Sequence, residues 1–73
     1  MEDRPLDALN ANRGKRVIVE LKNGKQYVGQ LRAFDIHINV VLDDAEEREH
    51  QKVTRKIGAL FIRGDAIVLL SVE

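Results

Sequence analysis

The stretch Lys15–Phe34 reads KRVIVELKNGKQYVGQLRAF, and it decides the fold. Its side chains alternate with a period of two on either side of Asn23-Gly24, the dipeptide most typical of a tight turn between antiparallel strands. The stretch therefore predicts a β-hairpin whose second strand runs over about Lys25–Phe34. Gly29 lies in the middle of that strand, where a missing side chain suits a sheet that bends sharply over itself.

The residues before the hairpin predict a short helix over about Arg4–Ala11. Pro5 suits the first helical position because its missing N–H has no partner there in any case. Leu6 and Leu9 share one face of the helix, and Asn12–Gly14 supplies the stop. A helix this short is not stable alone, so we expect the two leucines to dock on the rest of the fold.

The residues after the hairpin predict three further strands. Apolar side chains alternate over residues 36–42, which predicts a third strand with Ile36, Ile38, Val40 and Leu42 facing the core. The charged run Asp43–Gln51 predicts a break, followed by a fourth strand over Lys52–Ile62. A tight turn at Arg63-Gly64-Asp65 then leads to a last strand over Ala66–Val72. One helix and five strands joined by short turns favour a small, strongly bent antiparallel sheet or barrel.

The last two predicted strands carry large apolar residues on both faces, more than a small monomer can bury. An open five-stranded sheet has two edges, and an apolar edge in water favours pairing with another chain. We therefore expect these edges to pair between subunits, in a closed ring or an open fibre. A monomer by light scattering would contradict this expectation. A barrel closed within one chain is the alternative.

Length, charge and composition limit the function. The chain has 73 residues, 12 basic and 12 acidic residues and no cysteine, so we expect one domain over residues 1–73 without a disulfide framework. The N-terminus Met1–Arg4 carries two acidic residues, unlike a secretory signal, and no apolar run approaches the ~20 residues of a membrane span. We expect a soluble, cytoplasmic protein. A net charge of zero gives no overall attraction to nucleic acid.

Candidate catalytic groups are few. Ser71 is the only serine, Thr54 is the only threonine, and no thiol accompanies His37 or His50, so a nucleophile with a positioned base is not expected. The glycines lack the spacing of a phosphate-binding loop. We therefore predict no enzymatic activity, no cofactor and no metal. The acidic run 43–51 offers oxygen ligands for calcium or magnesium, but it fits no EF-hand, and a solvated surface that repels RNA is favoured.

Two short polar stretches interrupt apolar surroundings. In Asp35-x-His37-x-Asn39, a period of two places the three polar side chains on one face of the third strand. In Arg63-Gly64-Asp65, the glycine lets the backbone turn so that both charged side chains project. From these residues alone, an ordinary ion pair at a hairpin beside a solvated His37 is an equally good interpretation.

The two stretches resemble the sequence motifs of the Sm and Sm-like (LSm) proteins. Residues 17–43, with Asp35-x-His37-x-Asn39, look like the first motif, and residues 57–70, with Ile62-Arg63-Gly64-Asp65, look like the second. Arg4-Pro5-Leu6-Asp7 is typical of the archaeal branch. The resemblance implies a mainly β fold, in which a short N-terminal helix precedes a strongly bent five-stranded antiparallel barrel of the Sm (SH3-like) type. It also implies a ring, usually of seven identical subunits, that binds U-rich single-stranded RNA around its pore and supports RNA processing.

The resemblance also implies a binding site. A base would stack between His37 and Arg63, both flat, with cation–π attraction from the arginine. Asn39 would read uracil by accepting from N3–H and donating to a carbonyl oxygen. A freely rotating amide would not discriminate, so our own hypothesis is that Asp65, with help from Asp35, fixes its orientation.

Three further residues complete the set that the resemblance implies. Gly64 would allow the backbone to approach the nucleotide. Arg4 and Phe34 mark a candidate second RNA contact near the helix, which is weakened because Phe34 stands where archaeal members often carry tyrosine. The alternative function is a ring-shaped scaffold for protein interactions that does not recognise bases.

Overall fold

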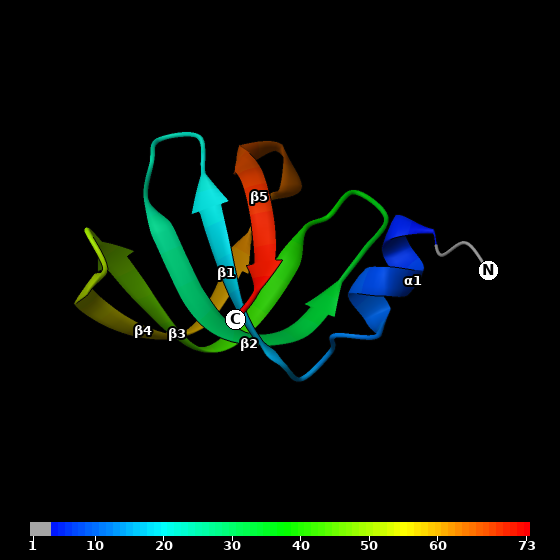
Figure 1. Cartoon of the computed structure of the whole chain (residues 1–73), viewed down its shortest axis with the longest axis horizontal. Coiled ribbons are helices and arrows are strands. Elements are labelled where there is room, and N and C mark those ends of the chain that lie inside the picture. Colours follow the sequence, from blue (N-terminus) through cyan, green and yellow to red (C-terminus); the bar gives the residue numbers. More distant parts are fainter. Residues whose placement is uncertain (1–3) are drawn as a thin grey trace.

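Figure 1 shows the computed structural model of the chain, which describes residues 4–73. Met1–Asp3, most of the acidic N-terminus considered above, lie outside the described residues. The elements in chain order are α1 (Pro5–Asn10), β1 (Arg16–Leu21), β2 (Gln26–Phe34), β3 (Val40–Glu49), β4 (Lys52–Ile62), a 3-10 turn (Gly64–Ala66) and β5 (Ile67–Val72). Within residues 4–73, no helix has the length and apolar character needed to cross a membrane.

The helix forms where the sequence predicts it. Arg4 caps it in an extended conformation and Pro5 takes the first helical position, where proline loses no hydrogen bond. Near its end, the side chain of Asn12 donates a hydrogen bond of 2.9 Å to the carbonyl oxygen of Ala8. Leu9 packs against the core of the sheet, so the docking of this leucine is confirmed.

The five strands form one antiparallel sheet in the order β4-β3-β2-β1-β5, which leaves β4 and β5 at the edges. The sheet is strongly bent, so that its two ends curl toward each other around the core (Figure 1). The predicted hairpin is present, and Asn23 Oδ1 accepts a hydrogen bond of 3.0 Å from the N–H of Lys25 in its turn. The core is built from buried side chains of β1 to β4: Val17, Val19, Leu31, Val40, Leu42, Ala45 and Ile62.

Gly29 lies where the sheet bends, as predicted. The pairing of β2 with β3 shifts register next to it. A Cβ atom at this position would lie 2.9 Å from the carbonyl oxygen of Asp43 and 3.1 Å from Cβ of Leu42. Only a residue without a side chain lets the two strands approach so closely.

The predicted start of the third strand was wrong. Residues 36–39 form a loop, and β3 begins only at Val40. Asp35 causes the difference, because its side chain accepts hydrogen bonds from the backbone N–H groups of His37 (2.8 Å) and Asn39 (3.2 Å). Such local bonds compete with strand pairing. Consequently Ile36 is 74% exposed instead of buried, whereas Ile38 takes a positive φ of 59° and packs on the core.

The predicted break over Asp43–Gln51 was also wrong. β3 continues through most of this acidic run, and the chain turns only at His50 and Gln51, which both have positive φ. The acids are accommodated because cations from other strands pair with them: Arg55 on β4 lies 3.4 Å from Glu47, and Arg16 on β1 lies 3.1 Å from Glu46. Opposite charges across two strands favour the pairing that a run of acids alone would discourage.

Glu47 shows how far this run departs from a solvated surface. The residue is only 7% exposed. Its carboxylate accepts hydrogen bonds from the hydroxyls of Tyr27 (2.8 Å) and Thr54 (3.0 Å). These bonds lower the pKa of Glu47 below its usual value, and the bond from Tyr27 has the largest effect. A carboxylate with such partners stays charged while largely buried.

Candidate functional site

Two loops that lie far apart in the sequence meet at the site. The β2–β3 loop contributes residues 35–39, and the turn between β4 and β5 contributes residues 63–66. The N–H of Gly64 donates a hydrogen bond of 2.7 Å to Oδ1 of Asn39. A Cβ atom on Gly64 would collide with the carbonyl oxygen of His37. The glycine is therefore needed for the two loops to touch, a role that differs from the approach to a nucleotide expected from the sequence.

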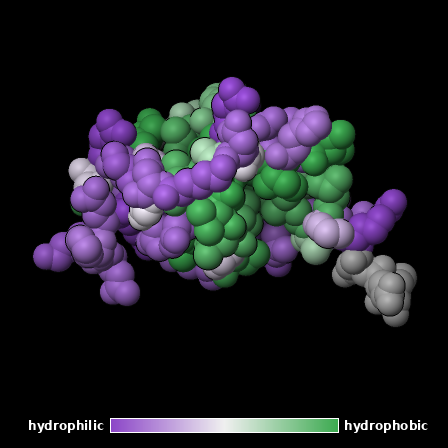
Figure 2. Space-filling model, turned by 90° about the horizontal axis from the view of Figure 1, so that it is seen from above, coloured by the Kyte–Doolittle hydropathy of each residue, from purple (hydrophilic) through white to green (hydrophobic). Residues whose placement is uncertain are grey.

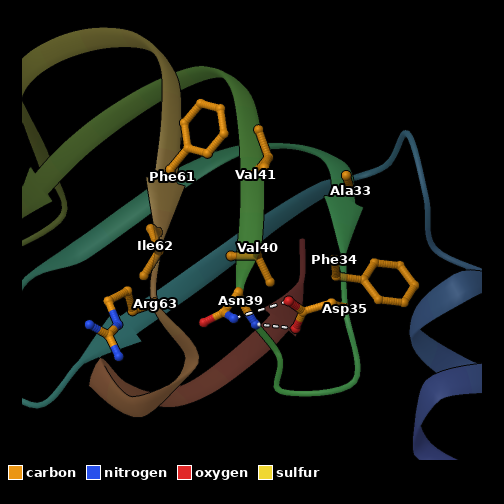
Figure 3. A pocket seen from close by; sticks show the side chains of 9 residues that line it. All are labelled: Ala33, Phe34, Asp35, Asn39, Val40, Val41, Phe61, Ile62 and Arg63. Carbon is orange, nitrogen blue, oxygen red and sulfur yellow. Dashed lines mark hydrogen bonds between the residues drawn. The ribbon is translucent and has the colours of Figure 1, made fainter.

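The amide of Asn39 has only one possible orientation. Its Oδ1 faces the N–H of Gly64, which can only donate, and its Nδ2 donates a hydrogen bond of 3.0 Å to Oδ2 of Asp35 (Figure 3). Asp35 is held in its charged, accepting form, because this bond and the one from the His37 N–H lower its pKa. A flipped amide would place donor against donor and acceptor against acceptor.

The aspartate that fixes the amide was predicted only in part. Asp35 accepts from Asn39, as the secondary expectation stated. Asp65, the first choice, instead lies 3.3 Å from the guanidinium of Arg63. The two aspartates thus have different partners: Asp35 holds the amide of Asn39, and Asp65 pairs with Arg63.

Five of the predicted residues line one open pocket of about 480 Å³: His37, Asn39, Arg63, Gly64 and Asp65. We call it the base pocket, after the ligand that is proposed for it below. The Arg63 side chain is 84% exposed, and its ion pair with Asp65 is open to solvent. An exposed pair of this kind contributes little to stability, so the guanidinium can leave Asp65 to cover a ligand. The geometry offers two flat groups around an amide of fixed orientation.

An apolar hollow of about 420 Å³ adjoins the base pocket and shares Asn39 and Arg63 with it (Figure 3). Val41 and Phe61 project from β3 and β4 into its upper part. Phe61 is 76% exposed although it is, with Phe34, one of the two largest apolar side chains there. The sequence shows apolar residues on both faces of this strand, but only the fold shows that they gather beside the polar motifs.

The two residues of the candidate second contact lie near the helix without meeting. Phe34 lines a hollow of about 280 Å³ between the β2–β3 loop and α1, and the guanidinium of Arg13 lies 5.9 Å from the centre of its ring. Arg4 is not part of that lining and instead pairs with Asp7, at 3.1 Å. Among residues 4–73, no group of three or more His, Asp or Glu side chains is placed to hold a metal ion.

Comparison with known proteins places these features in a family. The family model described as the LSM domain matches residues 7–72. An Sm-like snRNP protein of Archaeoglobus fulgidus is 49% identical over 71 residues, which cover 97% of this chain and 92% of the relative. An Sm-like snRNP protein of Methanococcoides burtonii is 46% identical over 71 residues, with 97% and 99% covered.

Solved structures agree with the sequence relatives. An Sm protein of Pyrococcus abyssi in complex with a uridine heptamer is similar with a TM-score of 0.92 and 41% identity, covering 97% of this chain and 100% of that chain. A heptameric archaeal Sm protein is similar with a TM-score of 0.85 and 36% identity, covering 90% and 96%. The fold of this chain, a short helix followed by a bent five-stranded antiparallel sheet, is therefore that of the Sm proteins.

Proposed function

Because this chain belongs to the LSM-domain family of Sm-like proteins, we propose that it is a non-enzymatic protein that binds single-stranded, U-rich RNA. In this proposal the chain forms one domain, and identical chains assemble into a ring, of seven subunits in keeping with the heptameric relative. The Pyrococcus abyssi relative was solved with a uridine heptamer, which supports uridine as the ligand. A cytoplasmic location and a role in RNA processing belong to the same proposal.

The observation that carries the proposal is the fixed amide of Asn39. Gly64 occupies one lone pair of Oδ1 and Asp35 one hydrogen of Nδ2, which leaves one acceptor and one donor free. Uracil offers the matching donor at N3–H and a neighbouring carbonyl acceptor. Cytosine in the same position would turn the lone pair of its N3 toward Oδ1. The pocket should therefore prefer uracil by about 1–3 kcal/mol, the worth of one good two-bond contact to a base.

The stacking partners would hold the base in that position. His37 and Arg63 both line the base pocket with their side chains exposed, so a base can slide between them. Stacking is worth ~1–3 kcal/mol per base and does not depend on its identity. Stacking would thus supply affinity, and Asn39 would supply selectivity.

The exposed apolar residues of the edge strands support the ring. Phe61 on β4, and Val68, Leu69 and Val72 on β5, are all exposed large hydrophobic residues. Pairing β4 of one copy with β5 of the next would cover them and satisfy both sheet edges. A ring would also bring several base pockets together, so that one RNA strand gains affinity through effective concentration.

Arg4 and Phe34 remain a second candidate contact in this proposal. Phe34 offers an aromatic face beside α1, on which a neighbouring base could stack. Arg4 would have to leave Asp7 to reach it.

The test is fluorescence anisotropy with labelled oligo-U, oligo-C and oligo-A at low and physiological salt. We expect tight binding to oligo-U alone, with a shallow salt dependence because the subunit has no net charge. Asn39→Ala should bind oligo-U more weakly and lose its preference for oligo-U over oligo-C. Weak binding to all three that vanishes with salt would instead favour the protein-interaction scaffold. Retained discrimination in Asn39→Ala would remove this residue from its reading role.

A further inference from the structure

The charges of this chain are unevenly placed, although acids and bases are equal in number. The hairpin ends at residues 20–26 and 47–56 carry six cations and three acids. The two ends are neighbours, because Gln26 pairs with Arg48. These hairpin ends lie on the side of the molecule opposite α1, and hydrophilic residues cover that side (Figures 1 and 2). We call this region the basic hairpin surface; its cations are Lys22, Lys25, Arg48, Lys52, Arg55 and Lys56.

Five of these six cations are incompletely neutralised; the sixth, Arg48, pairs with Glu46 at 3.4 Å and with Glu73 at 3.9 Å. Lys25 and Arg55 share one carboxylate, that of Glu47, at 3.8 and 3.4 Å, so this cluster keeps a positive surplus. Lys52 and Lys56 form no ion pair with any residue that the structure describes. Ammonium groups in this state attract anions from solution.

A polar hollow of about 530 Å³ lies between the two turns of this surface. Lys25, Arg48 and the side chains of His50 and Gln51 line it, together with one carboxylate, Glu49. Ammonium, guanidinium and amide groups are the donors that bind phosphate oxygens. The hollow therefore adds a concave donor site to the exposed lysines of β4.

The basic hairpin surface would stay accessible in the proposed ring. β4 has 11 residues and β5 has six. The apolar half of β4, Ile57–Ile62, matches the length of β5, so pairing between copies can cover that half alone. The half that carries Lys52, Arg55 and Lys56 then remains outside the paired region.

We propose that the basic hairpin surface binds the phosphate backbone of the RNA strand whose uracils occupy the base pockets. This inference rests on the proposed function and extends it, because phosphate contacts would be independent of sequence. They would make affinity depend on RNA length and on salt, whereas the base pocket sets the preference for uracil.

Two labelled RNAs test this inference by anisotropy: a heptauridylate, and the same heptamer followed by about 15 cytidines, a length in the range that single-strand-binding folds cover. Cytidine lacks the N3–H donor, so the tail cannot make the uracil contact; the salt slope then distinguishes phosphate contacts from stacking. Each single-strand phosphate contact adds about 0.7 to the slope of log K against log salt. With two contacts, we expect the tailed RNA to bind more tightly and its slope to be steeper by about 1.4.

Two variants test whether the gain in affinity from the tail comes from the basic hairpin surface. Lys52→Glu should remove most of the gain from the tail and leave binding of the heptamer unchanged. Lys15→Glu is the matched control, since Lys15 is an exposed lysine outside the basic hairpin surface and its replacement changes the charge equally. Light scattering should give the same mass for both variants, which excludes an effect through assembly.

The outcomes separate the two proposals. If the heptamer binds but the tail adds nothing, or if both variants weaken the tailed RNA equally, the inference is wrong and the lysines of β4 only discourage strand pairing. If the heptamer fails to bind while the tailed RNA binds and depends on Lys52, the base pocket fails and the backbone surface stands.

Discussion

Gly64 occupies the point at which the β2–β3 loop and the β4–β5 turn touch. A methyl group there would meet the carbonyl oxygen of His37, which belongs to the backbone and cannot turn aside. We expect Gly64→Ala to push the loops apart, break the bond to Asn39 and weaken binding of oligo-U by about 1–3 kcal/mol, the worth of the two-bond contact to the base.

The control for this prediction is Gly14→Ala. Gly14 has a φ of +81°, and a methyl group on its Cα would have no neighbouring atom within 4 Å. Alanine there costs about 1 kcal/mol of backbone strain without touching the site. Thermal melting should show a loss of stability for this variant, and anisotropy should show unchanged binding. If Gly64→Ala bound oligo-U as well as the control does, the contact between the loops would not matter to the pocket.

The sequence predicts the members of the site better than their connections. His37, Asn39 and Arg63 were expected because the two motifs resemble those of the Sm-like proteins, and all three line the base pocket. The bond between Asn39 and Gly64 joins residues 25 positions apart. A pattern of neighbouring residues cannot predict a bond over this separation. Which aspartate fixes the amide of Asn39, Asp35 or Asp65, depends on that bond.

At the scale of elements, the cluster around Glu47 ties β2, β3 and β4 together. The hydroxyl of Tyr27 stays protonated, because burial and the bond to Glu47 raise its pKa. Glu47 has a lowered pKa in the fold. A carboxyl of this kind stabilises the fold above its unfolded pKa, and this contribution is lost as the pH falls through the lower folded pKa.

Tyr27→Phe should therefore lower the melting temperature by several degrees at neutral pH. The gap between wild type and variant should shrink in acid, below the ordinary glutamate pKa of about 4.3, as Glu47 becomes protonated. Melting curves recorded over a range of pH at fixed protein concentration measure this difference in melting temperature. In a Glu47→Gln background the same substitution should show no such trend with pH. A gap that is constant with pH in the wild-type background would exclude this role of the carboxylate.

The elements that the sequence predicts well have local causes. The helix is marked by Pro5, the first hairpin by Asn23-Gly24, and β4 was predicted with the bounds that the structure shows. The two errors have causes that compete with the local pattern. The alternation over residues 36–39 predicted a strand, but the Asp35 side chain accepts backbone hydrogen bonds that hold these residues in a loop. The run of acids on β3 predicted a break, but Arg16, Arg55 and the hydroxyl of Tyr27 compensate these acids.

At the scale of the whole molecule, the proposed ring can be tested at one exposed residue. Phe61→Asp should yield monomers by light scattering, because a charge would be buried without a partner between copies. The residue is 76% exposed in the single chain, so the far-UV circular dichroism spectrum should stay that of the folded protein.

Ile36→Asp is the matched control for the ring. Ile36 is almost equally exposed, at 74%, but lies on the β2–β3 loop and not on an edge strand. Its substitution should leave the mass of the assembly unchanged. Equal masses for Phe61→Asp and wild type would show that this residue lies outside any interface, and a fall in mass for both variants would point to general loss of the fold.

The double engagement of Asn39 also bears on how such a protein could change over evolutionary time. One amide closes the gap between two loops and, in the proposed function, also recognises the base. A residue that replaced it to favour another nucleotide would still have to accept from Gly64 and donate to Asp35. Most single substitutions would dismantle the loops before they created a new preference. Proteins descended from one ancestral gene could therefore diversify their surfaces freely while their pockets kept the same nucleotide preference.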